Sequence, residues 1–298
     1  MATAFRKSRG EKVFDAVNHT LLALFGFSTL YPFIYSLVYS LNEGVDASRG
    51  GLFFWPRVFT LANYRLLFED ELLLNAFVFS VGRTLVGTFF HLLFTALLAF
   101  AFTKKDLPGR AFLTFLFFIT TLFSGGLIPK FLLYKTIGIY DTFWVFILPF
   151  TYVFFHMIIM RTFMSGIPVT LEESALMDGA GYWRVFISIV VPLSAPVIAT
   201  IALFMGVFQW NSWFDGLFFV NDRRLMPLQS LMQNMIRSHS MAAAAQEGGG
   251  AVDLMEQQVT NESLKMAAVM VATIPIVCVY PFLQRYFVKG VLIGSIKG

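Results

Sequence analysis

The run LNAFVFSVGRTLVGTFFHLLFTALLAFAF, residues Leu74–Phe102, carries a single charged side chain, Arg83. About 20 apolar residues are enough for a helix to cross the hydrocarbon core of a bilayer. An isolated strand leaves backbone groups unpaired in lipid, and a barrel strand alternates apolar and polar residues, which this run does not. The run therefore predicts a membrane-spanning helix in an all-α membrane protein.

Five further windows resemble this run in length and polarity. The chain is 57% hydrophobic and 13% charged, with 36 phenylalanines among 298 residues, whereas a soluble domain carries about 25% charge. We therefore expect one transmembrane domain over residues 1–298 with six spanning helices, the first of them an uncleaved helix. Besides 74–102, the expected spans are Asn18–Ser40, Ala111–Pro129, Thr142–Met160, Leu193–Trp213 and Met266–Leu283.

Basic residues cluster beside three of these spans, and the positive-inside rule assigns such clusters to the cytoplasm. Both termini are therefore expected in the cytoplasm, with residues 1–17 as the cytoplasmic N-terminus, 165–192 as a cytoplasmic loop and 215–265 as an external loop. Arginines also occur in the outer loops, but these loops are longer and contain acids. The clusters are Arg6, Lys7, Arg9 and Lys12, then Lys104, Lys105 and Arg110, then Arg285, Lys289 and Lys297.

Enzyme chemistry has little support. The histidines lie far apart without metal-ligand spacing, and no glycine-rich loop ends in Lys-Ser or Lys-Thr. The chain is thus expected to hold no cofactor or metal, to bind no nucleic acid and to have no catalytic residue. An intramembrane enzyme using His91 or His156 lacks a nucleophile, and an ion-coupled carrier lacks paired intramembrane acids. A neutral histidine bonded across a helix interface is the favoured interpretation of His91 and His156.

Residues 165–192, SGIPVTLEESALMDGAGYWRVFISIVVP, separate the fourth and fifth spans. Thr170 and Glu173 have capping-box spacing, and Gly179 to Gly181 would end a short helix. A second helix would begin at Tyr182 with an apolar stripe. Physical reasoning alone favours an amphipathic helix pair that lies on the bilayer.

The same loop resembles the EAA motif of ABC importer permeases, which reads Glu-Ala-Ala, three residues, Gly, nine residues, Ile, one residue, Leu-Pro. Glu173-Ser-Ala175, Gly179, Ile189 and Pro192 keep every spacing, with Ser174 and Val191 as the departures. Three segments further resemble the permease group for aldouronate and pectin-oligosaccharide import. They are Phe123–Pro129, Trp210–Asp215 and Tyr280–Gly290.

This resemblance to carbohydrate-uptake, maltose-permease-like importers implies the type I ABC importer permease fold with a cytoplasmic coupling helix. It implies a bacterial cytoplasmic-membrane subunit that imports oligosaccharides with a second homologous permease, an ABC ATPase dimer and an extracellular solute-binding lipoprotein. ATP and magnesium would be bound by the ATPase subunits. The residues implied to couple to the ATPase are Glu172, Glu173, Ala175, Asp178, Gly179, Ala180 and Pro192.

A cluster at the end of the fifth span suits sugars, which present apolar C–H faces and many hydroxyls. The candidate path residues are Gln209, Trp210, Asn211, Trp213 and Asp215, together with Arg83. At helical spacing Gln209 would share a face with Trp213, and Asn211 with Asp215. The alternative to sugar contact is that these aromatic residues form a belt at the membrane–water interface. Arg83 has two interpretations. It either snorkels or pairs with a carboxylate, or it contacts an anionic, uronate-containing solute.

Overall fold

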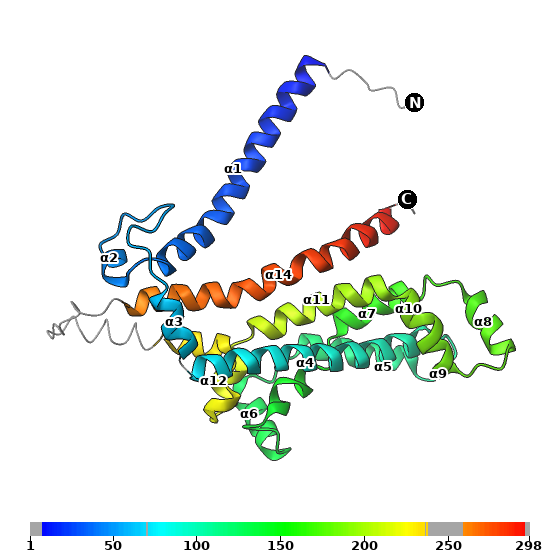
Figure 1. The fold of residues 1–298 in the computed structure, drawn as a ribbon. Coiled ribbons are helices and arrows are strands. Elements are labelled where there is room, and N and C mark those ends of the chain that lie inside the picture. The colour runs from blue at the N-terminus through cyan, green and yellow to red at the C-terminus, as the bar shows by residue number, and fades with distance from the viewer. Residues whose placement is uncertain (1–7, 70, 236, 238–258, 296–298) are drawn as a thin grey trace. The chain divides into compact units, whose positions relative to one another are not determined.

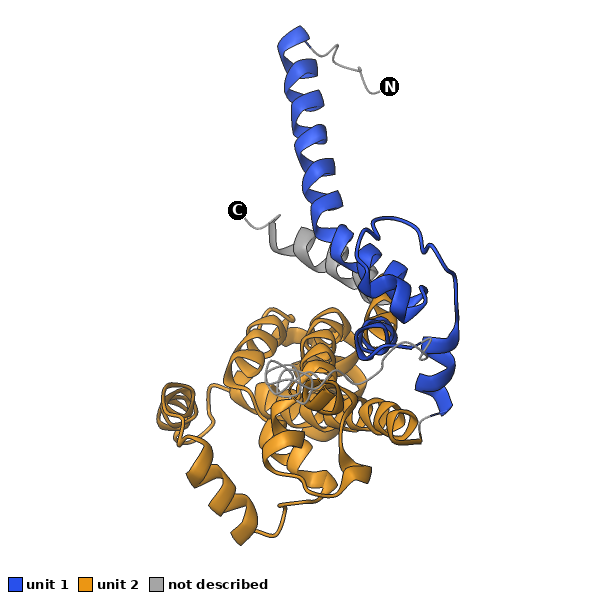
Figure 2. Cartoon of the chain, turned by 90° about the vertical axis from the view of Figure 1, so that its left-hand side faces the viewer, with its two compact units in different colours: residues 1–69, 238–271 blue, residues 70–237, 272–298 orange. Residues whose placement is uncertain are grey.

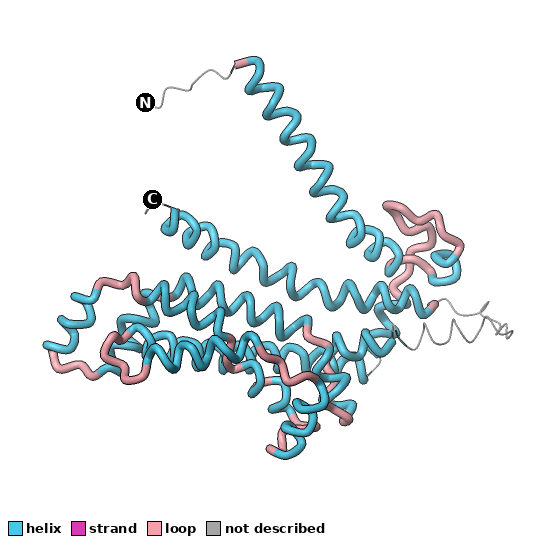
Figure 3. The backbone as a smooth tube through the Cα atoms, turned by 180° about the vertical axis from the view of Figure 1, so that it is seen from behind, coloured by secondary structure: helices cyan, strands magenta, loops and turns pink. Residues whose placement is uncertain are grey.

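The computed structural model describes residues 8–69, 71–235, 237 and 259–295 (Figure 1). Helices dominate this part of the chain. It contains no strand, and its one isolated β-bridge joins Asn42 and Phe59 (Figure 3). The side chains of 280 and 282–295 are not described, which includes those of Arg285, Lys289 and most of the Tyr280–Gly290 segment. Also outside the described residues lie Arg6, Lys7, His239 and Lys297.

The elements follow one another in a simple order. They are α1 Arg9–Ser40, α2 Gly44–Ser48, α3 Ala62–Glu69, α4 Glu71–Thr103, α5 Arg110–Leu122, α6 Leu127–Thr136, η1 Phe143–Phe146, η2 Leu148–Phe150, α7 Phe154–Met164, α8 Val169–Met177, α9 Tyr182–Val185, η3 Phe186–Val190, α10 Val191–Leu193, α11 Ala195–Asn211, α12 Phe214–Phe218, η4 Arg223–Leu225 and α14 Asn261–Ser295. Residues 228–235 are also helical.

Length and composition qualify four stretches of the described chain as membrane spans: Arg9–Ser40, Glu71–Thr103, Ala195–Phe218 and Asn261–Val279. Two bent helix pairs raise the number to six if each pair is one span. The sequence predicts one continuous helix for each pair, and the structure corrects both. α5 and α6 are bent by 119° at the break around Gly126, whose φ of 81° favours glycine. The η1–η2 segment, which contains Pro149, meets α7 at 51°.

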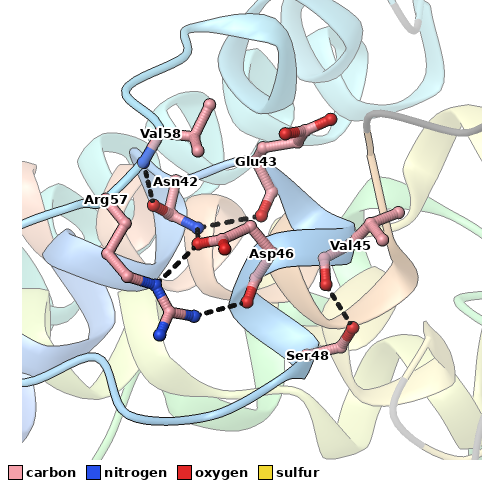
Figure 4. A network of polar contacts seen from close by, with 7 residues as sticks. All are labelled: Asn42, Glu43, Val45, Asp46, Ser48, Arg57 and Val58. Carbon is pink, nitrogen blue, oxygen red and sulfur yellow. Dashed lines mark hydrogen bonds and ion pairs between the residues drawn. The ribbon is translucent and has the colours of Figure 1, made fainter.

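The chain divides into two compact units (Figure 2). The first holds residues 1–69 and 238–271, and its α1 begins with a capping box in which Ser8 and Glu11 exchange hydrogen bonds. Beyond the end of α1, Asn42 and Arg57 both donate to Asp46 Oδ2 at 2.9 Å (Figure 4). The bonds from Asn42 and then Arg57 hold the pKa of the Asp46 carboxyl below its usual range.

The second unit holds residues 70–237 and 272–298, and α4 forms its centre. α7 and α11 both pack against α4, and Met157, Met160 and Ile201 are fully buried in the core. The packed face of α4 follows helical spacing, and its middle part consists of small or polar residues; small residues let helix backbones approach closely. These residues are Ser80, Arg83, Gly87, His91 and Thr95. Leu85 and Phe89, at other positions of the same helix, are exposed as a lipid-facing surface requires.

Candidate functional site

The loop with the spaced motif folds as the short helix α8, which stands beyond the ends of α4 and α11 in Figure 1. α8 begins at Val169 with Pro168 as its N-cap and has no side-chain cap. The predicted Thr170–Glu173 capping box is therefore wrong, because the helix starts before Thr170 and places its hydroxyl inside the first turn. Local proline geometry, rather than the threonine, sets the helix start.

The end of α8 is as predicted. Gly179 has a φ of 82°, a conformation that side chains disfavour. Its amide donates to the carbonyl of Leu176 at 3.0 Å, and the amide of Ala180 donates to that of Ala175 at 2.9 Å. These two bonds form a Schellman motif, which satisfies carbonyls that a helix end otherwise leaves open. The glycine thus turns the chain sharply between α8 and α9.

The predicted coupling residues separate into an exposed set and a packed set. Glu173, Asp178 and Gly179 are exposed, whereas Ala175 and Ala180 are half-buried and pack toward the core of the second unit. Pro192 lies in α10, away from α8 in the chain. Met177 is 88% exposed and is not among the residues that the motif predicts. Its apolar side chain in an otherwise polar turn is the signal that could have found it.

A second residue missed as a site residue is Lys104, which the sequence analysis used only for orientation. Its ammonium pairs with Glu172 at the start of α8. The same nitrogen lies 4.3 Å from the ring centre of Phe100 and 5.5 Å from that of Tyr182, two cation–π contacts. Lys104 therefore ties the end of α4 to both helices of the loop. A cavity of about 660 Å³ is lined by Lys104, Glu172 and Tyr182, among other residues.

Arg83 is fully buried in the second unit and does not snorkel. It donates from Nε to Gln209 Oε1 at 2.9 Å and from Nη1 to the carbonyl of Ser212 at 3.0 Å. Its Nη2 lies 3.5 Å from Asp215 Oδ2, so the charge pairs with a carboxylate, as one of the two interpretations expected. The guanidinium carbon Cζ of Arg83 lies over the ring of Phe146, 4.5 Å from the ring centre. Arg83 thus connects α4 to the end of α11 and to α12.

The candidate path residues do not share the helical faces that were predicted. α11 ends at Asn211 and Ser212 is extended, so Trp213 and Asp215 belong to the next turn. Asn211 is exposed and Trp213 half-buried, whereas Gln209 and Trp210 are buried. Gln209 donates to the carbonyl of Phe146 at 3.0 Å. Trp210 donates to that of Ala272 at 2.9 Å.

A basic residue that the sequence analysis did not select lies beside this cluster. The guanidinium of Arg237 lies 5.7 Å from the ring centre of Trp213. This distance is within the range of cation–π attraction. The pair brings a positive charge and an aromatic ring together near Asn211. Trp213 and Arg237 are more than 20 residues apart in the sequence, so no local pattern indicates that they are in contact.

The two intramembrane histidines are bonded across the interface of helices α4 and α7, as predicted, and the structure shows that they bond to each other. His91 Nδ1 lies 2.7 Å from the carbonyl oxygen of Phe150, which can only accept a hydrogen bond. His91 Nε2 lies 2.8 Å from His156 Nδ1. In the neutral pair His91 therefore donates to the carbonyl and accepts from His156. This arrangement joins the two helices and gives both ring nitrogens of His91 a partner.

Comparisons with known proteins agree on one class. A family model described as "Binding-protein-dependent transport system inner membrane component" matches residues 1–293. Protein LplC of Bacillus subtilis (strain 168) is 38% identical over 292 residues, which cover 98% of this chain and 97% of LplC. The polygalacturonan/rhamnogalacturonan transport system permease protein YtcP of the same organism is 38% identical over 288 residues, covering 96% of this chain and 99% of YtcP.

A solved structure supports the same conclusion for the fold. One chain of a bacterial ABC transporter involved in the import of the acidic polysaccharide alginate is 28% identical to this chain. The likeness covers 95% of this chain and 99% of that chain, with a TM-score of 0.85. The prediction of an all-α membrane protein with the ABC importer permease fold is confirmed. So is the resemblance to sugar-importing permeases on which that prediction rested.

Proposed function

Because the chain belongs to the family of binding-protein-dependent transport system inner membrane components, we propose that it forms half of the translocation path of an ATP-driven oligosaccharide importer. The observation that carries this proposal is the near full-length identity of 38% to a permease named for polygalacturonan and rhamnogalacturonan. The alginate transporter is likewise named for an acidic polysaccharide. The proposed cargo is therefore an acidic, uronate-containing oligosaccharide.

The importer would contain this chain, a second homologous permease and an ABC ATPase dimer that binds ATP and magnesium. An extracellular solute-binding lipoprotein would deliver the sugar. The chain itself would hold no cofactor and catalyse no reaction. It would lie in the bacterial cytoplasmic membrane with both termini, and the α8 loop, in the cytoplasm. The basic residues beside the spans, such as Lys104 and Arg110, support this orientation.

The α8 loop is the proposed docking element for the ATPase. Pro192, in α10 just before α11, stays in the proposed set of coupling residues. The exposed residues Glu173, Asp178 and Gly179 would touch the ATPase. Ala175 and Ala180 would transmit the movement because they pack on the core. The Lys104–Glu172 pair would make α4 follow α8 as the ATPase dimer closes. A rigid-body movement of this kind needs an attached element that cannot bend independently.

Two glycines in this loop allow a matched test. Neither Gly179 nor Gly181 has an atom within 4 Å of an added Cβ, but only Gly179 has a positive φ. Gly179→Val should distort the turn, because the left-handed conformation costs about 1–2 kcal/mol for side-chain-bearing residues. Gly181→Val should not. We expect binding-protein-stimulated ATPase activity and uptake by the reconstituted importer to fall only in the first variant. Equal coupling in both variants would refute the docking role.

The proposed sugar path uses the accessible part of the α11–α12 region. Asn211 and Trp213 would contact the sugar, and Arg237 would supply a charge for its carboxylates. The buried residues Arg83, Gln209, Trp210 and Asp215 would shape the path from behind, because their polar groups already bond within the protein.

Uptake measurements test the path and the cargo separately from coupling. Trp213→Ala and Asn211→Ala should each raise the apparent KM for uptake without preventing assembly, whereas Trp144→Ala, which removes a half-exposed ring elsewhere, should not. Arg237→Gln should weaken uptake of oligogalacturonate more than that of a neutral oligosaccharide, because only the former carries charge. Transport kinetics that match the parent in all variants would contradict this path.

A further inference from the structure

A groove of about 590 Å³ lies between α5 and α7. Its lining has two parts of different chemistry. Arg110 at the start of α5 and Arg161 in the last turn of α7 form the charged part. Ala111, Thr114, Phe115, Phe118 and Phe154 form the rest. The rings of Phe118 and Phe154, 5.7 Å apart, connect the two helices.

The charged part of the groove has an unbalanced positive charge. Among the described residues no ion pair includes Arg110 or Arg161. Both arginines line the same groove, so their like charges oppose each other across it. α5 also begins with Gly109 as its cap and has no acidic residue in its first turn, so its helix dipole adds to the positive potential. An anion placed between the two arginines would relieve this repulsion.

The position of the groove limits which anion can occupy it. Arg110 is the residue where the polar segment Lys104–Arg110 gives way to the apolar helix α5. Phe115 and Phe118 follow along α5 and are exposed. In a membrane-embedded chain this change of polarity marks the headgroup boundary, so the arginines lie at headgroup level and the aromatic rings at acyl-chain level. A soluble anion would match only the first part, whereas a phospholipid matches both.

We propose that the α5–α7 groove binds an anionic phospholipid, with its phosphate between Arg110 and Arg161 and its acyl chains along Phe115 and Phe118. Basic recesses between spanning helices recognise anionic headgroups in this way. The proposal depends on membrane insertion of the chain and not on the transported solute, so it can fail while the transport function holds, and the reverse.

The test uses the assembled transporter, purified and exchanged into mixtures of phosphatidylglycerol and phosphatidylcholine, with retained lipids identified by native mass spectrometry. The parent should retain phosphatidylglycerol preferentially. Each basic group near an anionic lipid surface contributes about fivefold, so Arg110→Gln with Arg161→Gln should reduce the preference about 30-fold. Replacing both arginines by lysine should keep most of it. Arg223→Gln with Arg224→Gln, an equal charge loss in η4, should change nothing.

Several outcomes would overturn the proposal. One is equal retention of the two lipids by the parent protein, a result that needs no variant and so does not depend on mutant folding. Another is an unchanged preference in the doubly substituted glutamine variant. A third is efficient cross-linking from Phe115→Cys to the second permease, since that would identify the groove as a protein interface. Cross-linking to a photoreactive lipid from the same position would instead support the lipid site.

Discussion

Removing Arg83 provides a sharp test of how burial decides the strength of an ion pair. Arg83→Met removes two well-formed hydrogen bonds, to Gln209 and to the carbonyl of Ser212. It also removes the positive charge that pairs with Asp215. Bonds to charged groups contribute about 1.5 kcal/mol or more each, which gives about 3 kcal/mol. The stranded carboxylate, 6% exposed and still bonded to Ser212 Oγ, extends the expected loss to about 5 kcal/mol.

The distances alone would predict the opposite ranking of the ion pairs. Arg57 and Asp46, in the segment after α1, lie 2.9 Å apart, whereas Arg83 and Asp215 lie 3.5 Å apart. Arg57 is 43% exposed, however, so water screens its charge and can replace its bonds. Arg57→Met is therefore the matched control, and it should change the stability of the protein far less than Arg83→Met.

The assay is detergent-induced unfolding of the purified protein, followed by tryptophan fluorescence, because the buried Trp210 reports on the α11 end directly. The double variant Arg83→Met with Asp215→Leu should recover part of the loss, because replacing both members of a buried pair removes the stranded charge. Equal midpoints for Arg83→Met and Arg57→Met would refute the reasoning. So would a double variant whose loss equals the sum of its two single losses.

Two further predictions concern packing and pH. A Cβ on Gly87 would lie 2.6 Å from Gln209 Nε2, so Gly87→Ala should cost about 1–3 kcal/mol in the same unfolding assay. Gly82→Ala, with open space around its Cβ, should cost nothing; equal losses would contradict the packing argument. Because the folded-state pKa of Asp46 is lowered, its stabilising contribution is present above the ordinary aspartate pKa and disappears as the pH falls below about 4. Hydrogen exchange of residues 42–58, corrected for intrinsic rates, should lose protection there in the parent but not in Asp46→Asn, and an identical pH response in both would exclude this linkage.

The sequence predicted the membrane class and the α8 loop because both depend on local properties. A window such as 74–102 needs only its composition to be recognised as a span. Gly179 marks the end of α8 because a single residue type favours a positive φ. The start of α8 was predicted wrongly for a similar local reason. Two rules competed there, and Pro168 at the N-cap prevailed over the capping-box spacing of Thr170 and Glu173.

Contacts between side chains that are far apart in the chain could not be predicted from the sequence. Nothing near Lys104 shows that it pairs with Glu172, and nothing near Trp213 indicates Arg237. The bends within two of the expected spans were also missed, because hydropathy averaged over a whole span does not register a short break such as Ser124–Gly126.

For this chain, the sequence by itself determined that the protein belongs in a membrane, that apolar helices dominate it and which loop carries the permease motif. Those properties follow from hydropathy and from the conformational limits of single residues. Only the tertiary structure decided whether Arg83 points to lipid, to solute or to a carboxylate. It pairs with Asp215 because α4 and α11 pack closely, and a charge buried between helices is stable only where a partner lies within reach.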